Sequence, residues 1–161
     1  VYTNHDYEPY ARQRDAEVKK ILQAKGIDFK TYKDQVIFEK EEVTKDDGKP
    51  YTVFTPYSKK WKALLKPANL KSFATETHFS AFKKFKPMAL PALEQLGFHP
   101  VGLPFPERVI RQTVISRYHE QRNFPAVAGT TRLSVHLRFG TVSIRKLAQV
   151  ALKKNETWLN E

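Results

Sequence analysis

The stretch that decides the fold assignment of this chain is Gly129-Thr130-Thr131-Arg132-Leu133-Ser134-Val135-His136-Leu137-Arg138-Phe139-Gly140. Three hydroxyl side chains and one arginine fall within five consecutive residues, at a predicted helix start. Gly129, just before them, gives the backbone the conformational freedom to turn there. Thr130 or Thr131 can cap this helix, and Leu133 and Leu137 lie on one of its faces. Free backbone N–H groups and the helix dipole favour an anion at such a position. The stretch therefore predicts a phosphate-binding turn, with an ordinary capped helix as the alternative.

A second predicted helix precedes this turn and points toward it. The helix starts at Pro106, which suits a first helical turn, and Phe124-Pro125 ends it. Residues at steps of four form one face of this helix: Ile110, Val114, Tyr118 and Arg122. We expect Tyr118 and Arg122 to project from the end of that face toward residues 130–134, which we call the threonine turn. As alternatives, Tyr118 is a core aromatic residue and Arg122 is a cation that stabilises the helix C-terminus.

These residues carry a family resemblance, together with three other motifs in the right order along the chain. The main motif resembles the flavin-binding segment of the DNA photolyase/cryptochrome family and reads Tyr118-x-x-x-Arg122-Asn123-Phe124-Pro125-Ala126-Val127-x-Gly129-Thr130-Thr131-Arg132-Leu133-Ser134. Two motifs are similar to the last strand-to-helix unit and the exit of that family's α/β domain: Asn4-x-Asp6-Tyr7-Glu8-Pro9-Tyr10 with Arg14-Asp15, and Lys49-Pro50-Tyr51-x-Val53-Phe54-Thr55-Pro56. The last motif resembles the opening of a helix that continues in this family as Trp-Arg-Glu-Phe, and it reads Thr157-Trp158-Leu159-Asn160-Glu161.

The resemblance implies a fold of the α/β plus all-α class, of which this chain covers only a part. Residues 1–65 are expected to form the C-terminal part of a Rossmann-like parallel-sheet domain, the photolyase antenna domain. Residues 66–105 are expected to form a long interdomain connector, and residues 106–161 the N-terminal part of a helical FAD-binding domain. We therefore expect an internal fragment of a class I type photolyase.

Local sequence patterns predict a βαβ unit at the start of the chain. Residues 1–3 are typical of a strand end, and Pro9 to Lys25 of a helix that Gly26 stops. One or two short strands are expected within residues 27–38, which makes a strand, helix, strand unit of a parallel sheet. The inward face of the helix is predicted to be Ala11, Val18, Ile21 and Leu22.

Further elements are predicted along the rest of the chain. Asp47-Gly48 marks a turn, and Thr55-Pro56 starts a helix that runs to about Leu65. A last long helix is capped by Ser143, and Asn155 can cap a helix after it. The buried stripe of the long helix is predicted to be Ile144, Leu147, Ala148, Ala151 and Leu152.

The resemblance also implies roles for individual residues. The residues expected to contact FAD are Tyr118, Thr130, Thr131, Arg132, Leu133 and Ser134. Arg122 matches a DNA-backbone contact, and Glu161 matches a carboxylate that meets the damaged base. Trp158 lies one helical turn before Glu161 and matches a residue close to the flavin and lesion pocket, so it is also expected at the DNA-binding site. The implied activity of the whole protein is light-driven, FAD-dependent repair of cyclobutane pyrimidine dimers, with the base flipped out of the duplex. A cryptochrome, which is a blue-light photoreceptor of the same fold without repair, is the alternative.

The resemblance limits what this chain can do alone. No catalytic residue is expected within it, and the isolated chain is expected to be inactive and to bind FAD poorly. Tyr10 and Ala11 occupy positions where members with a folate antenna carry polar contacts. A folate antenna is therefore not supported, and the type of any antenna chromophore stays open.

Charge and composition indicate the class of partner. The formal net charge is +11, and residues 108–154 carry ten Arg or Lys against the single acid Glu120. The basic half is expected to face a polyanion, with DNA containing pyrimidine dimers as the partner that the resemblance implies. A solvated basic surface, or an unrelated basic binding module, is the alternative. The chain has no cysteine and no histidine spacing typical of a metal site, and we expect a monomeric, cytoplasmic protein with no membrane partner.

Residues 66–105 contain five prolines and are expected to be irregular. Eight lysines and one acid within residues 59–86 are interleaved with aromatic residues. This composition suits a nucleic-acid surface, but we favour a connector that its aromatic side chains anchor and its lysines keep solvated.

Overall fold

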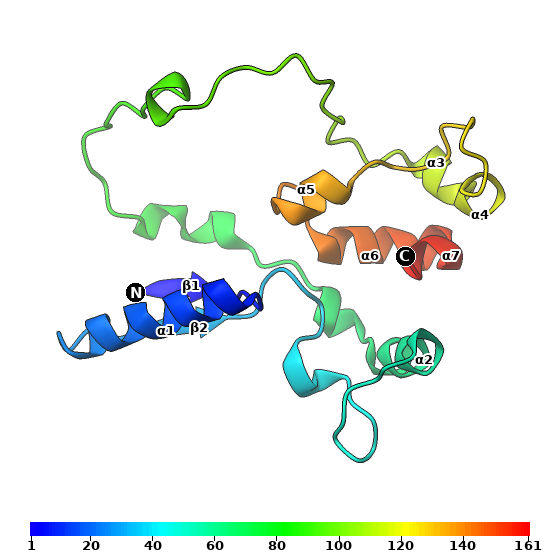
Figure 1. Cartoon of the computed structure of the whole chain (residues 1–161), viewed down its shortest axis with the longest axis horizontal. Coiled ribbons are helices and arrows are strands. Elements are labelled where there is room, and N and C mark those ends of the chain that lie inside the picture. The colour runs from blue at the N-terminus through cyan, green and yellow to red at the C-terminus, as the bar shows by residue number, and fades with distance from the viewer.

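The computed structural model describes all 161 residues, and its N-terminal part is a small parallel βαβ unit (Figure 1). Strand β1 (Tyr2–Asn4) pairs in parallel with β2 (Lys30–Tyr32), and helix α1 (Pro9–Gln23) joins them. The helix ends just before Gly26, whose φ of 67° lies in the left-handed region that glycine adopts without strain. The predicted strand, helix and parallel pairing are therefore confirmed, with one strand within residues 27–38.

The predicted inward face of α1 is wrong for two of its members. Ala11 is buried, but Val18 and Ile21 are 37% and 60% exposed. A sheet of two strands is too narrow to cover more than the beginning of a helix of this length. The amphipathic pattern is present, but in this structure it has no partner surface.

The main core lies elsewhere and joins segments that are far apart in the sequence. Helix α2 (Phe54–Leu64) follows a 3₁₀ turn η1 (Lys40–Glu42) and the predicted turn at Gly48, and a second 3₁₀ turn η2 (Pro67–Leu70) follows α2. Ile37, Leu70 and Ala148 form the buried centre of this core. Five partly buried side chains pack around it: Phe38, Trp61, Leu65, Ile144 and Leu159.

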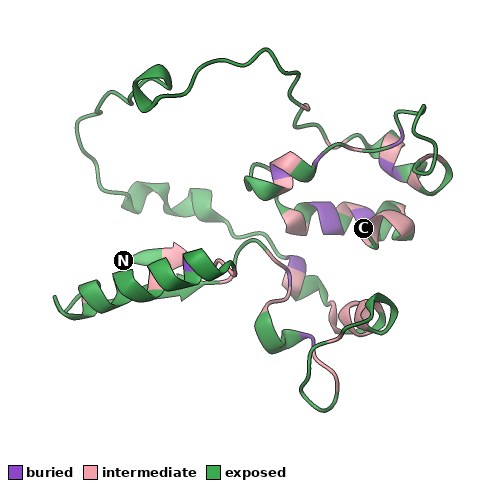
Figure 2. Ribbon diagram, in the orientation of Figure 1, coloured by how far each residue is buried: buried purple, intermediate pink, exposed green.

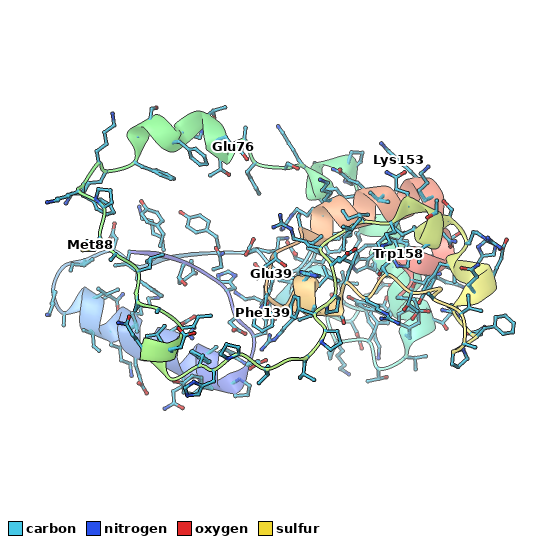
Figure 3. All side chains as sticks on the ribbon, turned by 90° about the horizontal axis from the view of Figure 1, so that it is seen from above. Glu39, Glu76, Met88, Phe139, Lys153 and Trp158 are labelled. Carbon is cyan, nitrogen blue, oxygen red and sulfur yellow. The ribbon has the colours of Figure 1, made fainter.

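Residues 71–105 form a long arch that leaves this core (Figure 1). The arch contains only the 3₁₀ turns η3 (Thr75–Ala81) and η4 (Glu94–Leu96). Its side chains are exposed along its whole length, including apolar ones such as Phe73 and Leu90 (Figure 2). Figure 3 shows Glu76 and Met88 well outside the dense group of side chains around Trp158.

The C-terminal part consists of five helices. These are α3 (Gln112–Ser116), α4 (Tyr118–Gln121), α5 (Ser134–Arg138), α6 (Ile144–Lys154) and α7 (Glu156–Leu159). The Ser143 side chain caps α6 by accepting from the backbone of Lys146, and Asn155 caps α7, both as predicted. Leu147, Ala148 and Ala151 are buried as predicted, whereas Leu152 is 53% exposed.

The predicted helix from Pro106 to Arg122 is wrong in its first half. Helical structure begins only at Gln112, and Arg117 interrupts it between α3 and α4. A helix that starts at Pro106 needs the carbonyl of that residue to accept from Ile110. That carbonyl instead lies 2.9 Å from Nε2 of His136, so a distant side chain takes the acceptor that the first turn requires.

Candidate functional site

The largest cavity among the structure's main pockets collects most of the residues singled out from the sequence. It has a volume of about 860 Å³ and lies against α5, α6 and α7. The predicted site residues that line it are Tyr118, Thr130, Thr131, Arg132, Leu133, Ser134, Trp158 and Glu161. The threonine turn and the end of the chain therefore meet at one hollow, although nothing in their local sequence specifies that they are neighbours.

The threonine turn is less regular than predicted. Helix α5 begins at Ser134, and neither Thr130 nor Thr131 caps it. The reason lies at Arg132, whose φ of 54° is left-handed and breaks any helix that would start earlier. The turn therefore presents its hydroxyl groups from an irregular loop, with Leu133 buried beneath it.

Arg122 lies beside the cavity rather than in its lining. Its guanidinium forms an ion pair with Glu161 and lies 5.8 Å above the ring centroid of Tyr118. The Arg122 and Glu161 side chains keep 33% and 49% of their surface exposed. Glu161, Arg122 and Tyr118, which the resemblance connects with DNA or flavin, thus form one chain of contacts at the edge of the cavity.

Asn155 holds α7, and with it Trp158, against the preceding helices. Its Oδ1 accepts from the backbone of Thr157 and Trp158, at 3.0 and 3.3 Å. Its Nδ2 lies 3.1 Å from the carbonyl oxygen of Ser116 and 2.9 Å from Nδ1 of His119. The cap was predicted, but this second set of contacts was not, because its partners lie on two other helices, α3 and α4.

An aromatic wall of the cavity comes from the N-terminal half and was missed by the sequence reasoning. Tyr57 and Trp61 of α2 and Phe38 line it, and the rings of Phe38 and Trp61 meet edge to face at 5.6 Å. The spacing of four between Tyr57 and Trp61 was the available signal, since it places both rings on one face of the predicted helix. The cavity lining therefore combines this aromatic wall with a hydroxyl-rich turn.

A polar cluster lies near the end of β1, apart from the cavity. The Tyr7 hydroxyl donates to Oε2 of Glu39 at 2.6 Å, and Nδ1 of His5 lies 2.7 Å from the same oxygen. Burial raises the pKa of Glu39, but the hydrogen bonds from Tyr7 and His5 outweigh it, so that this pKa lies below its usual value. The pKa of the Tyr7 phenol is raised, mainly by burial and to a smaller extent by its hydrogen bond to Glu39.

Two other features bear on the class of site. The structure holds no group of three His, Cys, Asp or Glu side chains placed to bind a metal ion. None of its helices has the length and apolar character needed to cross a membrane.

Comparison with known proteins identifies the family. A family model described as DNA photolyase matches residues 1–92, which is more than half of the chain. The chain belongs to the DNA photolyase family. The family resemblance that the sequence motifs indicated is thereby confirmed.

Relatives of this photolyase-family chain align along nearly all of it. A deoxyribodipyrimidine photo-lyase from Synechococcus is 35% identical over 170 residues, which cover 94% of this chain and 34% of the relative. Cryptochrome-1 from Arabidopsis thaliana is 27% identical over 176 residues, which cover 100% of this chain and 26% of the relative. The chain spans about a third of the length of the photo-lyases that it matches.

A solved structure supports the same assignment at the level of the fold. A bacterial class III photolyase from Agrobacterium tumefaciens superposes with a TM-score of 0.63 at 21% sequence identity, over 94% of this chain and 34% of that one. The mixed architecture, with a small parallel sheet and a group of helices, is therefore a photolyase architecture.

Proposed function

We propose that this chain supplies the middle part of a DNA photolyase that uses FAD and light to split cyclobutane pyrimidine dimers. The observation that carries the proposal is the cavity of about 860 Å³, which is shared by the threonine turn, Tyr118, Trp158 and Glu161. These residues come from three separate segments, and each was connected with the flavin or the lesion by a motif. The names of the Synechococcus and Halobacterium salinarum relatives support the same activity.

The residues around the cavity fit a flavin dinucleotide. Thr130, Thr131 and Ser134 offer hydroxyl donors and Arg132 a fixed positive charge, which are the groups that hold a diphosphate. The aromatic wall of the cavity offers rings against which a flat heterocycle can pack. A volume of several hundred Å³ is typical of cofactor pockets. When bound, FAD would supply the light-absorbing and electron-donating chemistry, and the residues of this chain would bind and orient it.

The DNA contacts in this proposal lie at the rim of the cavity. Arg122 would meet the DNA backbone, while Glu161 and Trp158 would meet the extruded base. The ion pair between Arg122 and Glu161 supports their placement at one location. Because Arg122 keeps about a third of its side chain exposed, a phosphate can reach it without rearrangement of the helices.

The domain plan of the proposal follows the motifs. Residues 1–65 would complete an antenna domain, residues 66–105 would connect it to the flavin domain, and residues 106–161 would begin that domain. The exposure of the arch at 71–105 supports its role as a connector. Its exposed apolar side chains would be covered by the domains that it connects. We propose a monomeric protein of the cytoplasm, with an antenna chromophore whose type stays open.

The test uses the full-length protein with DNA that contains a single thymine dimer. We expect bound flavin by absorption, and dimer loss under blue light that is absent in the dark. The variant Arg122→Ala should weaken DNA binding and reduce the slope of its salt dependence by about one phosphate contact. The matched control is Arg12→Ala on the exposed face of α1, which should leave the slope unchanged. Flavin binding without dimer loss would favour the cryptochrome alternative, which the likeness to cryptochrome-1 supports.

The isolated 161 residues offer a second test of the same picture. They should bind FAD poorly, because one wall with the threonine turn and one aromatic wall leave a wide opening to solvent. A titration of FAD against the purified chain measures this directly. Tight stoichiometric binding would contradict the proposed incompleteness of the pocket.

A further inference from the structure

His136 is the one charged or polar side chain that the structure buries. Only 6% of the residue is exposed, although it stands on the short helix α5 in a chain with few buried residues. Both ring nitrogens have partners: Nε2 lies 2.9 Å from the carbonyl oxygen of Pro106, and Nδ1 lies 2.9 Å from Oγ1 of Thr141. A carbonyl oxygen can only accept, so Nε2 donates to Pro106. The Thr141 hydroxyl lies within hydrogen-bond distance of Nδ1 and also donates to the His136 carbonyl oxygen at 3.4 Å.

Only two hydrogen bonds join residues 72–110 to the rest of the chain. One is the local pair between Glu107 and Arg111, four positions apart, and the other is the contact between Pro106 and His136, thirty positions apart. All other hydrogen bonds of the segment join residues within it. The Phe105 ring adds an edge-to-face contact with the imidazole, at 5.5 Å between ring centroids. His136 therefore tethers the end of the arch to α5.

This tether reaches the wall of the cavity. Pro106 lines the cavity, and so do Leu133, Ser134, Val135 and Leu137, which surround His136 on and before α5. His136 itself is absent from the lining and lies on the side of α5 that meets the arch. It thus connects Pro106 to the helix that carries the threonine turn, without facing the cavity.

The backbone of His136 fixes a third segment. Its carbonyl oxygen accepts from the backbone of Thr141 at 3.0 Å and of Val142 at 3.4 Å, and the turn passes through Gly140 with a φ of 63°. This turn leads directly to Ser143, which caps α6. One residue therefore joins the arch, α5 and the start of α6.

We propose that His136 is a positioning residue for the cofactor site: it holds Pro106 in the cavity wall and so sets the shape of the pocket beside the threonine turn. The cofactor part of this inference rests on the proposed function, whereas the tether itself does not. His136 acts through Pro106 and Thr141 and needs no contact with the cofactor.

The test compares variants of the full-length protein by limited proteolysis with trypsin and by FAD affinity. His136→Phe keeps the ring against Phe105 but removes both hydrogen bonds. Only the hydrogen bond to Pro106 holds the arch. Loss of one buried hydrogen bond corresponds to about a fivefold change in an equilibrium constant, so the rate of cleavage after the exposed Arg108 should rise by about fivefold. The dissociation constant for FAD should rise by about the same factor. His136→Gln, whose amide can donate to the Pro106 carbonyl, should recover most of both effects.

The control is His99→Phe, at an exposed position without a hydrogen bond, which should change neither measurement. Unchanged cleavage at Arg108 in His136→Phe would overturn the tether. Faster cleavage with unchanged FAD affinity, in a protein that binds FAD, would overturn the positioning role. Absence of FAD binding by the wild-type protein would count against the proposed function, while the cleavage rates would still decide the tether. Should His136→Phe fail to fold, Thr141→Val removes one of the two hydrogen bonds with little change of shape and should show a smaller effect in the same direction.

Discussion

In the βαβ unit of residues 1–32 only Ala11 is buried, whereas residues 35–70 share their core with α6 and α7 near the other end of the chain. The first region has a larger share of its residues in helices and strands than the second, and the two differ in how far their apolar side chains are buried. In the first region most apolar side chains of α1 stay exposed. In the second, residues about a hundred positions apart close one core and one cavity. A regular helix is therefore not enough to bury its apolar side chains. Only in the second region do the apolar side chains of a helix enter a core.

The largest expected effect comes from α3, which packs against α6 and so supports the core that the second region shares with α6. Ile115 on α3 is fully buried, so Ile115→Ala should lower the free energy of unfolding by about 3 kcal/mol through lost burial and the cavity left behind. The matched change Ile21→Ala on α1 should cost less than about 0.5 kcal/mol, because that side chain is 60% exposed. Urea unfolding of both variants measures the difference. Equal losses would remove the contrast between the two regions.

A smaller effect is expected where α6 meets the segment after β2. The Arg145 guanidinium donates to the carbonyl oxygens of Asp34 and Val36, at 2.7 and 3.2 Å. Arg145→Met keeps the aliphatic stem but leaves both carbonyls without this donor, which should cost about 1 to 2 kcal/mol of unfolding free energy. Arg12→Met on α1 is the control, since its side chain makes no hydrogen bond or ion pair in the structure, and it should be nearly neutral. A neutral Arg145→Met would mean that these two hydrogen bonds contribute nothing to the attachment of α6 to residues 34–36.

The smallest effect concerns the polar cluster that links the βαβ unit to residues 35–70. Because the pKa of Glu39 is lowered in the folded protein, its contribution to stability is complete above the usual glutamate range and is lost as the pH falls through that range and below. The advantage of the wild type over Glu39→Gln should therefore shrink between about pH 5 and pH 3. Thermal unfolding across this range, with Glu17→Gln on α1 as the control, measures it. An advantage that grows toward low pH would reverse the sign and contradict the hydrogen bonds from Tyr7 and His5.

Local patterns predicted the elements whose causes are local. The βαβ unit, α2, and the caps at Ser143 and Asn155 follow from periodicity and from residues at their own ends. The prediction failed at Pro106, because its carbonyl is taken by His136, thirty residues later. It also failed at the threonine turn, because Arg132 adopts a left-handed conformation that its residue type does not favour.

The candidate site was predictable to the same extent. Its motif residues were found, and the cavity brings most of them together. The aromatic wall formed by Phe38 and Trp61 was missed, since nothing local connects α2 with a turn some seventy residues later. The role of Asn155 in holding α7 to Ser116 was missed for the same reason.

The core of Ile37, Leu70 and Ala148 has a consequence for how the protein is made. A ribosome that adds about 5 to 20 residues per second needs about 4 to 15 seconds to pass from the first two of these residues to the third. During that interval Phe38, Trp61 and Leu65 have emerged without the helices that cover them. Binding by chaperones during synthesis would be most useful to residues 35–70, before any part of the cavity exists.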